Sequence, residues 1–154
     1  MAITNNTDFT SGQILTAQQQ NNFPRGIMAI SKATATDATI TVLEETFSVS
    51  FTAVANRNYR VTYFEPEVTG ASGAYTNIAI YVTSIAFSAN QLAGGYVYAP
   101  AVNSYTSITV THVGTFTAGT VVIKGAASAS SGTSKVGRAA TQPAFLMVED
   151  IGTA

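Results

Sequence analysis

The chain has 154 residues, of which 46% are hydrophobic and only 10% are charged, and its formal net charge is −1. This length and composition predict one folded domain with a sizeable core and exclude a compositionally disordered chain. So small a net charge provides no basic field, and we therefore expect neither nucleic acid nor an anionic membrane as a partner. The chain has no cysteine, which excludes disulfides, thiolate metal sites and cysteine nucleophiles.

The beginning of the chain, Met1-Ala-Ile-Thr-Asn-Asn, lacks the charged and apolar regions of a signal peptide. No apolar run approaches the length of a membrane span, so we expect no membrane insertion. These features predict a protein made in the cytoplasm.

Residues 1–25 differ from the rest and predict an N-terminal arm with one short helix near 16–22. Thr16 and Gln19 have the spacing of a capping box, and Gly12 and Pro24 bracket the segment. The helix is short and polar, so we expect it to be held by docking of apolar side chains around it. These are Phe9, Ile14 and Phe23.

From residue 26 onward the hydrophobic period is two, which is typical of strands. In 47–52, for example, Phe47, Val49 and Phe51 alternate with polar residues. One apolar face and one Thr/Ser face per strand predict an antiparallel β-sandwich over 26–154. About nine strands are expected, at 26–32, 39–43, 46–54, 58–65, 76–85, 95–98, 107–113, 120–124 and 144–151.

Several features of this domain allow more than one interpretation. The strand series fits a jelly roll or an Ig-like sandwich, and we favour the jelly roll. Residues 125–142 are rich in Gly, Ala and Ser, and predict either a flexible excursion or an edge strand lying against a neighbour. The run Phe145-Leu-Met-Val is apolar on both faces, which indicates a central strand or one buried by a second subunit.

Candidate catalytic residues are few. His112 is the only histidine and continues the inward face of its strand, so we interpret it as a packing residue. Composition does not exclude a Ser-His-Asp triad, but no Gly-x-Ser-x-Gly elbow occurs. Glu65 and Glu67 would point to one side of an extended chain and suit a cation such as Ca²⁺, although a solvated turn explains them more simply. We expect no enzymatic activity, no metal and no cofactor.

Three tyrosines flank the turn at 99–104 and form a candidate contact patch: Tyr96, Tyr98 and Tyr105. Tyrosine rings at a loop are suited to stacking on sugars or to contacting another protein. The alternative is that they are ordinary sheet aromatics, which β-propensity alone favours.

Three segments carry a family resemblance: 9–28, with Leu15-Thr-Ala-Gln-Gln followed by Asn, Pro and Gly; 51–61, Phe51-Thr-Ala-Val-Ala-Asn-Arg-Asn-Tyr-Arg-Val; and 144–152, Ala144-Phe-Leu-Met-Val-Glu-Asp-Ile-Gly. Together they resemble small virion structural proteins of tailed bacteriophages, frequent in phages of actinobacteria. Members are usually labelled minor tail proteins, and some are head decoration proteins or head fibres.

The resemblance implies a virion structural protein without catalytic residues. We expect a capsid decoration protein on the particle exterior, with a minor tail protein or a carbohydrate-binding adhesion module as alternatives. The expected partners are copies of the chain in a trimer, the major capsid protein or tail proteins, and a host-surface glycan. The expected assembly contacts lie at the two ends of the chain: Phe9, Ile14, Leu15, Phe23, Phe145 and Met147.

Overall fold

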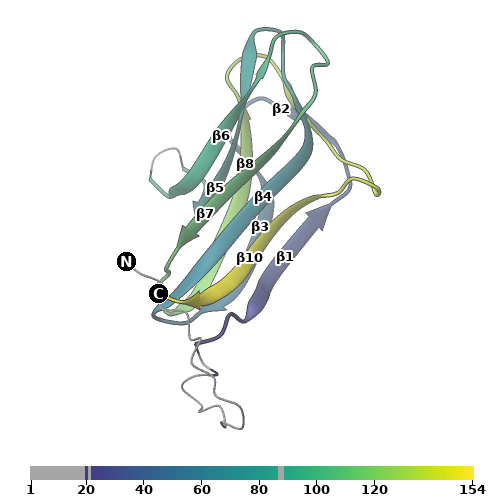
Figure 1. The fold of residues 1–154 in the computed structure, drawn as a ribbon. Helices are drawn as coiled ribbons and strands as arrows, with labels where there is room; N and C mark the ends of the chain where they lie inside the picture. Colours follow the sequence, from purple (N-terminus) through teal and green to yellow (C-terminus); the bar gives the residue numbers. More distant parts are fainter. Residues whose placement is uncertain (1–19, 21, 87–88) are drawn as a thin grey trace.

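The computed structural model describes residues 20, 22–86 and 89–154, and in this part of the chain ten strands form two antiparallel sheets packed as layers (Figure 1). The first sheet contains β1 (Gly26–Ala33), β10 (Ala144–Thr153), β4 (Arg57–Thr69), β9 (Ser134–Gly137) and β2 (Asp37–Ile40) in that order, with β7 (Thr106–Gly114) also on β4. The second sheet has the order β3 (Glu44–Ala53), β8 (Gly119–Ala129), β5 (Ala74–Val82) and β6 (Gln91–Ala99).

The long strands pair in a nested order. The first strand, β1, pairs with the last, β10, and β3 pairs with β8. Inside them β4 pairs with β7, and β5 pairs with β6. When the long strands are followed along the chain, only β5 and β6 are both consecutive and neighbours in one sheet. Every other step from one long strand to the next crosses between the layers. The short strands β2 and β9 pair with each other and extend the first sheet beyond β4.

Alternation along each strand produces the core. On β4, for example, Tyr59, Val61 and Tyr63 are fully buried between the sheets, whereas Arg60 points outward and is exposed. Aromatic rings from both sheets meet there, with the Phe47 and Tyr63 centroids 5.5 Å apart and those of Phe51 and Tyr59 5.0 Å apart. The sequence pattern therefore identified the buried face correctly.

The expected all-β, antiparallel class is confirmed, and the two layers are consistent with the expected sandwich. Each of the nine expected strands overlaps an observed one, and β9 is not among the nine. The helix near 16–22 lies almost wholly outside the described residues. The division into an arm over 1–25 and a domain over 26–154 therefore remains a prediction.

Part of residues 125–142 does form strands, as one interpretation expected, but these strands are not at a sheet edge, and their residues are not a flexible excursion. The first five of these residues continue β8, which lies between β3 and β5, and β9 lies between β4 and β2. Small side chains are needed here because the facing elements approach closely. Two stretches that lie between the expected strands also belong to strands, since Glu44 and Glu45 begin β3 and residues 91–94 belong to β6.

Gly125 shows how close this approach is. A Cβ atom added to Gly125 would lie 3.1 Å from Cε1 of Tyr63 and 3.3 Å from Cβ of Phe47. We expect Gly125→Ala to lower the free energy of unfolding by about 1–2 kcal/mol, because the Tyr63 ring must shift in a packed core. Urea denaturation measures this change. A gain in stability, as expected from the reduced flexibility of the unfolded chain alone, would contradict the packing argument.

Candidate functional site

The outer face of the first sheet carries an apolar groove with a volume of about 800 Å³. Its apolar lining comes from three adjacent strands, with Ile30 on β1, Phe145 and Met147 on β10, and Phe64 on β4. Its polar lining includes Lys32, Glu67, Tyr105 and Gln142. The groove is therefore an apolar strip with only two charged residues, of opposite sign, in its lining.

Strand register explains why these apolar side chains meet. Phe145 pairs with Phe64 across the ladder, and their ring centroids are 5.4 Å apart. Met147 pairs with Ile30 on the other side of β10. The alternate residues, Leu146 and Val148, are fully buried in the core. A run that is apolar on both faces thus supplies the core with one face and the groove with the other.

This arrangement answers one question left open by the sequence. The strand β10 is indeed central, between β1 and β4, yet Phe145 and Met147 remain only half-buried on its outer face. Two of the expected assembly contacts, Phe145 and Met147, therefore lie together in the groove. Ile30 and Phe64 lie beside them and were not identified from the sequence. The alternation of residues 28–32 and 59–65 was the available signal, but only the register shows that they are neighbours.

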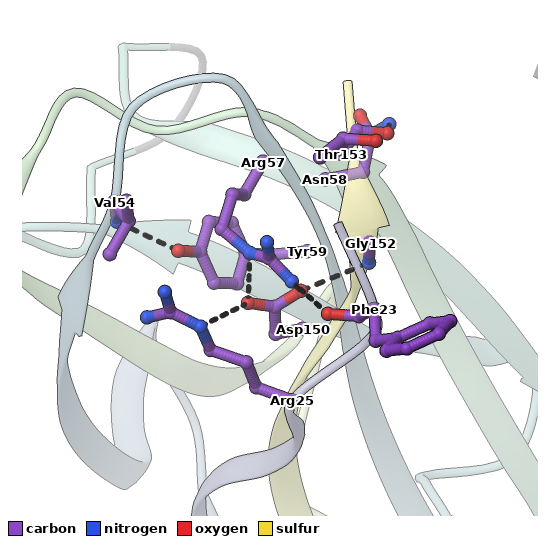
Figure 2. A network of polar contacts seen from close by, with 9 residues as sticks. All are labelled: Phe23, Arg25, Val54, Arg57, Asn58, Tyr59, Asp150, Gly152 and Thr153. Atoms are coloured by element: carbon purple, nitrogen blue, oxygen red, sulfur yellow. Dashed lines mark hydrogen bonds and ion pairs between the residues drawn. The ribbon is translucent and has the colours of Figure 1, made fainter. Parts of the chain in front are cut away.

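A second feature, shown in Figure 2, lies where β10 ends and β4 begins. The side chains of Arg57 and Asp150 form a buried ion pair in which two guanidinium nitrogens donate to the carboxylate, Nη2 at 2.7 Å from Oδ1 and Nε to Oδ2. Arg57 Nη2 also donates to the Phe23 carbonyl oxygen at 2.6 Å. The Gly152 N–H donates to Asp150 Oδ1 at 2.9 Å. The network thus joins residue 23, which precedes β1, to two core strands.

Several interactions favour the charged form of the Asp150 carboxyl group. Burial by itself raises the pKa of this carboxyl group, but hydrogen bonds from Arg57 and Gly152 and the positive charges of Arg57 and Arg25 outweigh it. The pKa of Asp150 is therefore below its ordinary value, and the ion pair stays charged at neutral pH. Figure 2 shows the Phe23 ring turned away from this network, so its backbone is held while its side chain stays partly exposed.

The remaining assembly contacts expected at the N-terminal end, Phe9, Ile14 and Leu15, lie outside the described residues. Sequence inspection did not identify Arg57 and Asp150. They are 93 residues apart in the chain, and no local pattern links them.

Another buried network lies between the sheets. The guanidinium group of Arg138 donates to both oxygens of Glu65, with Nε 3.0 Å from Oε2 and a second bond from Nη2 to Oε1. The Tyr63 hydroxyl donates to Glu65 Oε1 at 2.6 Å and lies 2.7 Å from Thr46 Oγ1. Burial, together with the negative charge of Glu65, raises the pKa of Tyr63 well above its ordinary value. Hydrogen bonds thus connect Arg138, Glu65, Tyr63 and Thr46 in one buried network, of a kind that makes a core rigid.

The interpretation of Glu65 and Glu67 as a cation site is not supported. Glu65 is fully buried and paired with Arg138, whereas Glu67 lines the outer groove. The ladder between β4 and β7 has an irregularity between Glu65 and Val68, which changes the alternation there. Among residues 20, 22–86 and 89–154 no group of acidic or histidine side chains is arranged to hold a metal ion.

His112 lies on the inward face of β7, half-buried, with its ring centroid 6.2 Å from that of Phe116. Burial lowers the pKa of His112, opposed by a hydrogen bond to the backbone of Leu92. A neutral, packed imidazole fits its interpretation as a packing residue.

The three candidate tyrosines are not one patch. Tyr96 and Tyr98 share the outer face of β6, where their neighbour is Tyr75 on β5. Tyr105 lies apart, lining the groove of the first sheet, with Lys135 Nζ 5.5 Å from its ring centroid. The prediction that grouped Tyr105 with the other two is wrong because the turn at 99–104 crosses from one sheet to the other. Spacing along the chain does not show this crossing.

No family model matches the chain, and no curated protein matches it in sequence. In the part of the chain that the structure describes, no helix is both long and apolar enough to cross a membrane.

Proposed function

We propose that this protein is a non-enzymatic structural subunit of a tailed-bacteriophage particle, and specifically a capsid decoration protein on the particle exterior. The resemblance of residues 9–28, 51–61 and 144–152 to phage virion proteins motivates the proposal. The nested pairing of β1 with β10, β3 with β8, β4 with β7, and β5 with β6 supports the favoured jelly roll. Jelly rolls are used by viral capsid and lectin domains, so this architecture suits the proposed role.

The observation that carries the proposal is the apolar groove on the first sheet. A soluble domain that assembles with neighbours exposes contiguous apolar surface, which a solitary domain avoids. The groove occurs in a chain with only 10% charged residues, so little electrostatic repulsion opposes packing of copies. We propose that its occupant is a second copy of this chain, and that three copies close into a trimer.

A variant in the groove tests this assembly. Ile30 is 44% exposed at the edge of the groove, and Ile30→Glu would place an unpaired carboxylate in the contact. We expect the dissociation constant of the trimer to rise by at least about tenfold, equivalent to ~1.4 kcal/mol. Sedimentation velocity over a range of protein concentrations measures it, with thermal unfolding as a check that the fold is retained.

Val113→Glu provides the matched control, because Val113 is an exposed apolar residue on β7, and it does not line the groove. This control should leave the trimer intact. A wild-type chain that stays monomeric at high concentration, or equal effects of both variants, would contradict assembly through the groove.

The minor tail protein is the second placement for such a subunit. A minor tail protein would have the same fold and the same contact between copies, and would differ only in the part of the particle to which the oligomer attaches. Labelling of intact particles separates the two, since antibodies against a decoration protein bind over the whole capsid. Binding at the tail tip alone would overturn the capsid placement.

A further inference from the structure

The outer face of the second sheet, opposite the groove, carries a cluster of three tyrosines. Tyr75 on β5 pairs with Tyr98 on β6, and their ring centroids are 5.0 Å apart with 43° between the ring planes. Tyr96 is two residues from Tyr98 on the same face and is 70% exposed, the most open aromatic side chain of the described residues. Exposed rings on a rigid sheet give a stacking surface that loses little conformational freedom on binding.

A small hollow of about 180 Å³ lies beside these rings, lined by Tyr75, Asn77, Tyr96, Ser128, Ala129 and Ser130. It is smaller than the sites of drug-sized ligands, which occupy about 300–1,000 Å³. A hollow of this size accommodates one ring or one substituent of a ligand whose remainder lies along the sheet.

Asn77, one of the residues that line the hollow, has an unused hydrogen-bonding group. Asn77 is only 5% exposed, and its Oδ1 atom has no hydrogen-bond partner among the described residues. A buried acceptor without a partner is costly, and such groups in folded proteins call for an explanation. A ligand hydroxyl that enters beside Tyr96 would satisfy this acceptor after a small rotation of the amide group.

Charge narrows the ligand class. None of the residues that line the hollow is charged. The charged pair farther along this face, Lys124 and Glu45, is joined by a hydrogen bond of 2.6 Å, so each charge is already neutralised. A ligand here meets aromatic faces, an amide and two serine side chains, and no compensating charge.

We infer that the cluster of Tyr75, Tyr96 and Tyr98, with Asn77 in the adjacent hollow, is a binding site for a neutral glycan. A pyranose ring has one apolar face of C–H groups, which stacks on tyrosine, and hydroxyls at its edge, which bind amides and serines. This site goes beyond the proposed assembly role, because it lies on the other sheet and needs no second copy.

The test is binding of the full-length protein to an array of neutral and acidic oligosaccharides, followed by titration of the best neutral ligand. We expect the protein to bind neutral hexose-containing glycans. Acidic groups on a glycan should not strengthen the binding. Tyr96→Ala should raise the dissociation constant of the neutral ligand at least about tenfold, as the loss of a stacked ring at a binding hot spot does. Asn77→Ala should also raise it, while Tyr96→Phe should retain most of the binding.

Val113→Ala is the control, because Val113 is an exposed apolar residue, 55% exposed, that lies on the other sheet and outside the groove. It should leave both the trimer and glycan binding unchanged. Absence of binding to every neutral glycan, binding of acidic glycans only, or an equal loss in Val113→Ala would overturn the site. If Tyr96→Ala instead dissociates the oligomer, the cluster is a contact between copies and the glycan assignment is wrong. Retention of the trimer alongside loss of glycan binding separates this site from the groove.

Discussion

Asp150→Asn is expected to lower the free energy of unfolding by about 3 kcal/mol, because the substitution leaves Arg57 as a buried charge without its counter-charge. The Asp150 side chain is fully buried and accepts hydrogen bonds from Arg57 and from the Gly152 N–H. Urea denaturation at neutral pH measures the change. Hydrogen exchange at the Gly152 amide should accelerate in the variant, since its acceptor is weakened.

Glu149→Gln is the matched control. Glu149 is the neighbouring residue on β10, and its ion pair with Arg60 lies at the surface, where water screens it. We expect this variant to unfold at nearly the wild-type urea concentration. Equal effects of the two variants would show that the buried network contributes no more than an ordinary surface pair.

The same carboxyl group predicts a pH dependence. Its folded pKa is below its unfolded value, which is about 3.9 for aspartate. The stability that it contributes is therefore complete above that pH, and is lost as the pH falls through the lower folded pKa. The difference in stability between the wild type and Asp150→Asn should be constant from pH 8 to pH 5 and should narrow below about pH 4. A difference that persists unchanged at pH 3 would contradict this linkage.

Glu65→Gln is expected to lower the free energy of unfolding by about 3–5 kcal/mol, because it removes the negative charge that compensates the buried Arg138. Glu65 is fully buried, and the Arg138 side chain is nearly so, with the guanidinium carbon 4.9 Å from the centroid of the Phe47 ring. Little water reaches the guanidinium group to screen the charge that is left unpaired. Chemical denaturation at neutral pH measures the loss.

The double variant Glu65→Leu/Arg138→Leu separates the pair from its parts. Replacing both charges with apolar residues leaves no unpaired charge, so we expect it to recover most of the stability lost in Glu65→Gln. The Tyr63 hydroxyl retains Thr46 as a partner in this variant. A double variant as unstable as Glu65→Gln would show that packing around these residues, and not charge pairing, determines the effect.

Local patterns predicted much of the fold because side-chain alternation is a local property. The apolar members of residues 47–51 and 59–63 do face the core. The strand β9 was missed because Ser134–Gly137 has little intrinsic strand preference, and its pairing with β4 and β2 determines its conformation.

The candidate sites were predicted only in part, since they depend on contacts between distant segments. Phe145 and Met147 were identified from a run that is apolar on both faces, but Ile30 and Phe64 join them through the register of β1 and β4. Tyr96 and Tyr98 were grouped with Tyr105 because all three flank one turn, but only Tyr96 and Tyr98 share a face of the sheet. Tyr75 completes the cluster through the pairing of β5 with β6, which spacing along the chain does not reveal.

The number of copies of this protein in each phage particle tests most directly whether it is, as proposed, a subunit of the particle surface. If the proposed phage origin is right, quantitative mass spectrometry of purified phage particles measures the ratio of this protein to the major capsid protein. A capsid decoration protein predicts hundreds of copies per particle, in a ratio fixed by the capsid lattice. Absence of the chain from purified particles would contradict the proposed role.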